Sequence, residues 1–156
     1  MNNSANSNIY SFANDAAWER FEAHLSGNRS GFVCVISNSP LSANARTALE
    51  ASMERLGYGA AACTFITLFE DRADGSCLSD QDLLELIEGL DPRVVIAADS
   101  ESARLFGRAF RTAVPLLDYS HVAGRRTIAF GSFQSMLEEA SDKQRAWALL
   151  KRLARQ

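Results

Sequence analysis

Three side chains of this sequence could act together as the reactive groups of a hydrolase or a transferase. Asp99 directly follows the apolar run VVIAA, His121 lies in a predicted loop, and Ser132 follows the last apolar run. A carboxylate, an imidazole and a hydroxyl can serve as orienting group, general base and nucleophile. One hypothesis is therefore an enzyme that uses these three side chains, with Asn38 as an alternative to Ser132.

The same positions could instead form a binding site. In open α/β sheets, ligands bind outside the carboxyl ends of the strands, and polar residues follow the predicted strands of this chain. The candidate ligand-binding residues are Asn38, Ser39, Asp99, Ser100, Ser132 and Gln134. Helix capping is the competing interpretation, because Asp and Ser are preferred at helix N-termini. It applies to Asp99 and to five serines, namely Ser42, Ser79, Ser100, Ser132 and Ser141.

The sequence lacks the motifs of common nucleotide, esterase and metal sites. It contains no GxGxxG, no GxxxxGK[ST] and no GxSxG. Three widely spaced cysteines form no CxxC, and His24 and His121 stand far apart, so no set of metal ligands is expected. His24 falls on the first predicted helix and is expected at the surface. We therefore expect no metal, no cofactor, and a cytoplasmic protein with reduced thiols.

These side chains would be positioned by an alternation of helices and strands. Apolar residues at helical spacing predict helices, and short β-branched runs bounded by glycine or proline predict buried strands. The predicted helices cover residues 14–26, 42–56, 79–90, 100–112, 132–140 and 141–153. The predicted strands cover residues 32–37, 60–69, 94–98 and 126–130, with a short strand-like piece at 114–119.

This alternation predicts an α/β fold, a three-layer, doubly wound parallel sheet of four to five strands with helices on both faces. Residues 11–156 are expected to form one domain, and residues 1–10 a disordered N-terminal lead-in. No apolar run approaches the roughly 20 residues that span a bilayer, and the polar N-terminus is not typical of a secretory signal. No membrane partner is therefore expected.

Charge is unevenly distributed along the chain. The formal net charge is −3, but residues 1–103 carry 6 Arg and 15 Asp or Glu, whereas residues 104–156 carry 10 Lys or Arg and 4 Asp or Glu. Such an asymmetry can steer an anionic partner to one face. The competing interpretation is that charged helix faces are solvated and pair with one another.

Three segments resemble the uracil-DNA glycosylase superfamily, especially its bacterial small-sheet branches. They are ARTALEASMERLGYGAAACTFITL (45–68), LLELIEGLDPRVVIAADSESARLFG (83–107) and GRRTIAFGSFQSMLEEASDKQRAWALLKRL (124–153). The resemblance covers about residues 30–153. It implies a four-stranded parallel sheet flanked by helices, and an ancestral activity that excises a flipped base from DNA.

The functional residues of that family are largely replaced. Where the family has a glycine-rich motif with an acid or amide, this chain has Ile36-Ser37-Asn38-Ser39-Pro40, in which Asn38 alone could stand in. The place of the base-reading Asn is held by Leu68, and the His-Pro-Ser stretch corresponds to Gly131-Ser132-Phe133. Losing one such electrostatic group costs a factor of about 10²–10³ in rate. An active glycosylase is therefore not expected.

The resulting hypothesis is a glycosylase-like fold without its catalytic residues, acting as a module that binds a small molecule, a nucleic acid or a protein partner at the carboxyl edge of the sheet. The enzyme of another class that uses Asp99, His121 and Ser132 is the alternative, together with residual nucleic-acid binding or base excision. A structural protein that forms a homodimer through an apolar helix face is a third hypothesis.

Overall fold

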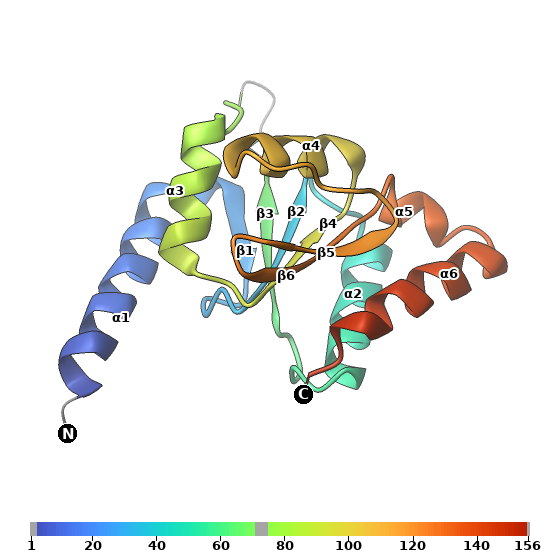
Figure 1. The fold of residues 1–156 in the computed structure, drawn as a ribbon, viewed down its shortest axis with the longest axis horizontal. Helices are drawn as coiled ribbons and strands as arrows, with labels where there is room; N and C mark the ends of the chain where they lie inside the picture. Colours follow the sequence, from blue (N-terminus) through green and yellow to red (C-terminus); the bar gives the residue numbers. More distant parts are fainter. Residues whose placement is uncertain (1–2, 71–74, 156) are drawn as a thin grey trace.

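Six strands form one mixed sheet in the order β1-β3-β2-β4-β6-β5 (Figure 1). The computed structural model describes residues 3–70 and 75–155, with side chains from residue 12 onward. Along the sheet, the strands are β1 (Leu25–Gly27), β3 (Cys63–Thr67), β2 (Val33–Ser37), β4 (Val94–Ala97), β6 (Arg125–Ala129) and β5 (Asp118–Val122). The α/β class is confirmed, and each of the four predicted main strands is present.

The sheet differs from the prediction at its two edges. The inner strands β3, β2, β4 and β6 are parallel, whereas β1 pairs antiparallel with β3 and β5 pairs antiparallel with β6. The expected parallel sheet of four to five strands is therefore corrected to a six-stranded mixed sheet. Both edge strands carry polar, partly exposed residues and lack the apolar run by which a buried strand is identified.

Helices cover both faces of the sheet (Figure 1). Successive side chains of a strand point to opposite faces, so Val33 and Val35 belong to one apolar core and Cys34 and Ile36 to the other. The first core is covered by α2 (Ala43–Arg55), α5 (Phe133–Met136) and α6 (Ala140–Leu150), the second by α1 (Asn3–Arg20), α3 (Asp80–Leu90) and α4 (Ser100–Ala109). None of the helices in the described ranges is long and apolar enough to cross a membrane.

Helix capping explains several polar residues of the sequence. The Ser42 side chain caps α2 by accepting a hydrogen bond from the Ala45 amide at 3.1 Å, and Ser79 forms a capping box at the start of α3. Helix α4 is capped by Asp99, so the prediction of Ser100 as its cap is wrong. Ser141 lies inside α6, whose N-cap residue Glu139 makes no side-chain cap bond.

The N-terminal part differs most from the prediction. Helix α1 begins at Asn3 and ends at Arg20, whereas the predicted helix covers residues 14–26. A short 3-10 helix, η1 (Glu22–His24), then leads directly into β1. Strand β1 pairs with β3 and ends at Gly27. Gly27 has φ +87°, and an added Cβ would approach the Cys63 carbonyl oxygen to 2.5 Å, so this close approach requires glycine.

The C-terminal part follows the predicted order with shifted boundaries. The strand-like piece expected at 114–119 is β5, which begins at Asp118, and the helix expected at 132–140 is the single turn α5. Helix α6 continues into a 3-10 turn, η2 (Lys151–Leu153). This turn ends beside the amino ends of the inner strands, because Arg126 of β6 donates hydrogen bonds to its carbonyl groups.

Candidate functional site at the carboxyl edge of the sheet

The predicted site lies where the strand order reverses. The chain passes from β2 to β3 on one side, and then to β4 on the other side of β2, so the loops after β2 and β4 diverge. Such a switch point is where open α/β sheets bind ligands. Asn38 directly follows β2, and Asp99 lies two residues beyond the end of β4. The fold therefore brings these two predicted site residues together.

The Asp99 carboxylate is occupied by backbone amides. Its Oδ2 accepts a hydrogen bond from the Asn38 amide at 2.8 Å, and its Oδ1 accepts one from the Ser102 amide at 2.8 Å. The Ser102 hydroxyl completes the capping box around the start of α4. Asp99 thus ties the two switch-point loops together and caps a helix, which confirms the capping interpretation and leaves its carboxylate oxygens already bonded.

Ser132 and Gln134 also serve the local structure. Ser132 pairs with Asp99 through an isolated antiparallel bridge, which places it near the switch point. Its hydroxyl oxygen accepts a hydrogen bond from the Ser135 amide at 3.2 Å and lies 3.0 Å from the Ser135 hydroxyl. The Gln134 Oε1 accepts a hydrogen bond from the Ser42 amide at 2.7 Å and so links α5 to the start of α2.

His121 lies at the other end of the sheet. It pairs with Arg126 in the β5–β6 ladder, and Arg126 in turn pairs with Val94, the first residue of β4. Its ring makes an edge contact with Tyr119, whose hydroxyl lies 3.2 Å from the His121 Nε2. Asp99 lies two residues beyond the end of β4, so the side chains of Asp99 and His121 are separated by about the length of that strand. The proposed convergence of Asp99, His121 and Ser132 is therefore wrong.

The prediction that His24 lies at the surface is also wrong. His24 is only 6% exposed, and its Nδ1 lies 2.8 Å from the Thr67 carbonyl oxygen. Because a carbonyl can only accept, Nδ1 carries the proton, and in the neutral ring Nε2 keeps its lone pair. Together with Ser37, His24 lines a cavity of about 150 Å³ at the ends of β2 and β3.

No periodicity in the sequence could have revealed this histidine. Its burial depends on the 3-10 turn that follows α1 and on the antiparallel edge strand β1, neither of which has a clear sequence signal. Nε2 also lies 4.0 Å from the Glu70 carboxylate. This cavity is small, and neither Asn38 nor Asp99 lines it.

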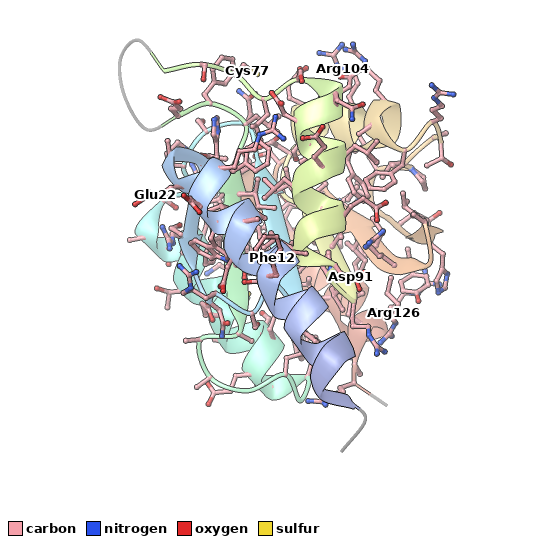
Figure 2. All side chains as sticks on the ribbon, turned by 90° about the vertical axis from the view of Figure 1, so that its left-hand side faces the viewer. Phe12, Glu22, Cys77, Asp91, Arg104 and Arg126 are labelled. Carbon is pink, nitrogen blue, oxygen red and sulfur yellow. The ribbon has the colours of Figure 1, made fainter. Side chains whose placement is uncertain are left out.

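A larger pocket, the carboxyl-edge pocket, opens beside Asn38 on the face covered by α3 and α4. Its volume is about 600 Å³. The lining includes Asn38, Leu68, Phe69, Cys77, Arg104, Leu105 and Arg108. Figure 2 shows Cys77 and Arg104 at the same end of the molecule, with Arg126 toward the other end. Two further predicted binding residues, Ser39 and Ser100, are exposed. Unlike Asn38, they do not line this pocket.

The pocket combines an apolar wall with charged groups of both signs. Arg104 pairs with Glu101 at 2.6 Å, and Arg108 pairs with Asp80 at 3.1 Å. These pairs are exposed, and exposed pairs contribute only about 0–1 kcal/mol, so an incoming ligand can replace either partner at low cost. Within residues 3–70 and 75–155, the Asn38 side-chain amide makes no hydrogen bond, so its donor and acceptor both remain available to a ligand.

Among the described residues that line this pocket, neither an activated nucleophile nor a metal site is found. Partial burial raises the pKa of the Cys77 thiol, which disfavours the reactive thiolate. Among the described residues, no three His, Cys, Asp or Glu side chains are grouped so that they could hold a metal ion. The arrangement suits recognition of a ligand through hydrogen bonds and apolar contact better than covalent chemistry.

No protein-family model matches this chain, and no curated protein matches it significantly.

Proposed function

We propose that this chain is a non-catalytic binding module, built on a fold of the uracil-DNA glycosylase type, whose ligand occupies the carboxyl-edge pocket. The observation that carries the proposal is the contrast between Asn38 and its neighbours. The polar side-chain atoms of Asp99 and Ser132 are bonded to backbone amides and cap helices, whereas the side-chain amide of Asn38 makes no hydrogen bond to the described residues, and Asn38 lines a pocket. Four inner parallel strands with helices on both faces support the proposed fold type.

The chemistry of the pocket defines the class of ligand. A volume of about 600 Å³ lies within the range of roughly 300–1,000 Å³ that is typical of small-molecule sites. The Asn38 amide offers one donor and one acceptor edge, as a nucleobase or another cyclic amide would require. Leu68, Phe69 and Leu105 provide contact for a flat ring, and Arg104 or Arg108 can pair with an anionic substituent.

Loss of base excision is part of the proposal. Leu68 cannot hydrogen-bond a base edge, and no histidine follows β6, so two groups that stabilise the reaction in the family have no counterpart here. The test is an excision assay on single-stranded and duplex DNA that contains uracil. We expect no excision above the spontaneous rate. Excision by the wild-type chain that an Asp99→Asn variant abolishes would refute the non-catalytic assignment.

Ligand binding is tested by a thermal-shift screen of nucleobases, nucleosides and nucleotides against the wild-type chain. A ligand at 100 times its Kd stabilises the native state by about 2.7 kcal/mol, which is readily detected. Asn38→Ala should abolish most of the shift. Ser39→Ala is the matched control, because Ser39 is the exposed neighbour in the same loop and does not line the pocket. A shift of equal size in both variants would exclude Asn38 as the recognition group.

The remaining expectations stay predictions. A cytoplasmic location is supported by the three free cysteines, of which Cys34 and Cys63 are buried. Burial raises the pKa of the Cys34 thiol to about 12, so this thiol stays protonated and unreactive in the native protein. Formation of a homodimer and the division into a lead-in and a single domain are predictions of the same kind.

A further inference from the structure

A basic pocket lies at the opposite edge of the sheet, and we propose that it binds a phosphate ester that carries a planar base. We call it the amino-edge pocket. Its volume is about 400 Å³, and it is lined by Phe32, Tyr58, Arg93, Val94, Gly124, Arg126 and Arg155. Phe32 precedes β2 and Arg93 precedes β4, so the pocket is a full strand length away from the carboxyl-edge pocket and forms an independent site.

The lining carries positive charge without compensating carboxylates. Three guanidinium groups line the pocket, and no Asp or Glu is among its described lining residues. Arg93 and Arg155 are exposed, and in the described part of the chain neither has a carboxylate oxygen within 4.0 Å. Elsewhere on the surface, by contrast, several exposed arginines, such as Arg104 and Arg145, are paired with acids.

Arg126 has a structural role that separates it from the other two. Its guanidinium donates hydrogen bonds to the Arg152 carbonyl at 2.7 Å and to the Ala154 carbonyl at 3.2 Å, and to the Tyr58 hydroxyl at 3.3 Å. These carbonyl groups carry the negative end of the dipole of α6 and η2, which the Arg126 charge compensates. Arg93 and Arg155 are not needed for this purpose, and their charges remain available for an anion.

An aromatic ring, that of Phe32, lies near both available arginines. Phe32 is 38% exposed, and the guanidinium carbons of Arg93 and Arg155 lie 6.0 and 5.8 Å from the centre of its ring. These separations are at the outer limit of cation–π attraction, so both side chains can move toward a ligand at small cost. The Tyr58 ring lies 6.1 Å away and is tilted by 50°. A base can stack on the Phe32 ring while its phosphate reaches both guanidinium groups.

The combination of ring and charge decides the ligand class. A site for inorganic phosphate would need the arginines alone, and a site for an apolar molecule would need the ring alone. A nucleotide uses both, and a volume of about 400 Å³ is within the range of small-molecule sites. The same chemistry is offered by a free nucleotide and by one nucleotide of a single strand, so the experiment must separate these two sources.

Titration calorimetry at low salt tests the proposal with ADP, pyrophosphate, adenosine and a hexamer of thymidylate. We expect ADP to bind at least about tenfold more tightly than pyrophosphate or adenosine, and added salt to weaken its binding. The double variant Arg93→Ala, Arg155→Ala and the variant Phe32→Leu should each weaken ADP binding about tenfold or more. Phe32→Leu keeps an apolar side chain and removes only the ring. Circular dichroism verifies that both variants fold.

The matched control is Arg145→Ala, which should leave ADP binding unchanged. Arg145 is an equally exposed arginine that pairs with Asp142 and lies outside the pocket. Tighter binding of the hexamer than of ADP identifies a nucleic-acid strand as the source, and the reverse identifies a free nucleotide. The proposal is overturned if neither binds at millimolar concentration, if pyrophosphate binds as tightly as ADP, or if folded pocket variants bind like the wild type.

Discussion

Asp99 connects three parts of the structure through one carboxylate. It follows β4, caps α4 through the Ser102 amide, and holds the loop after β2 through the Asn38 amide. Because removal of its oxygens leaves two partly buried N–H groups unbonded, we expect Asp99→Ala to lower the free energy of unfolding by about 2–3 kcal/mol. Urea denaturation measures this change.

Ser100→Ala is the control for this prediction. Ser100 is the neighbouring residue and a preferred N-cap type, but it is exposed and lies in the first turn of α4. A change there should stay within about 0.5 kcal/mol. Equal losses in both variants would mean that the hydrogen bonds of Asp99 do not determine the effect, because alanine is the better helix former at either position.

For single residues, the sequence predicts which side chains lie near one another better than it predicts what those side chains do. Residues that directly follow parallel strands must meet at one sheet edge, so the neighbourhood of Asn38 and Asp99 was predictable from the alternation of elements. The separation of His121 was not, since it depends on β5 running antiparallel as an edge strand. The burial of His24 was equally hidden, because it arises from contact with Thr67, 43 residues further along the chain.

The inner elements could be predicted because they are buried on both sides. Strands β2 and β4 consist mainly of apolar residues, and β6 ends in the apolar pair Ile128 and Ala129. Each of the three strands is followed by a polar cap residue that begins a helix, namely Ser42, Asp99 and Ser132. Strand β1 has only three residues, and β5 reads DYSHV with a single fully buried side chain. Their pairing is decided by the free edges of β3 and β6, which a local sequence pattern does not report.

The junction between α3 and β2 depends on Gly31. This residue has φ +70°, and an added Cβ would lie 2.9 Å from the Leu90 Cβ at the end of α3. Gly31→Ala therefore combines backbone strain with overpacking, and we expect it to lower the free energy of unfolding by about 2–5 kcal/mol. Thermal or urea unfolding provides the measurement.

Gly59→Ala separates the two causes. Gly59 has φ +95°, but an added Cβ would meet no atom within 4 Å, so only the backbone strain of about 1–2 kcal/mol is expected. If both variants lose the same stability, the close approach to Leu90 contributes nothing, and the helix end must relax to accommodate the methyl group.

In the described part of the chain, one sheet separates the two large apolar cores. The core under α1, α3 and α4 and the core under α2, α5 and α6 share the backbone of the inner strands, so neither can lose its packing without exposing the other face of the same strands. Both proposed ligand sites lie at the ends of these strands. The two sites keep fixed positions only if the sheet between them is rigid. Because both cores share this sheet, we expect them to unfold cooperatively.

The two tryptophans of the chain report on these cores separately. Trp18 is buried beside α3 and donates a hydrogen bond to the Arg29 carbonyl at 3.0 Å, whereas Trp147 packs against the core on the opposite face. In Trp147→Phe, the remaining fluorescence comes from Trp18, and in Trp18→Phe it comes from Trp147. Within each variant, we expect the fluorescence and circular dichroism curves in urea to share one midpoint, because the two cores unfold together.

The comparison must be made within each variant, because Trp18→Phe also loses the bond to Arg29 and should unfold at a lower urea concentration than Trp147→Phe. A fluorescence midpoint of Trp18 below the circular dichroism midpoint in Trp147→Phe would show that the face covered by α1 unfolds first. The two cores would then be separate cooperative units. Coincident curves would support one domain, in which the sheet holds the carboxyl-edge and amino-edge pockets in fixed positions.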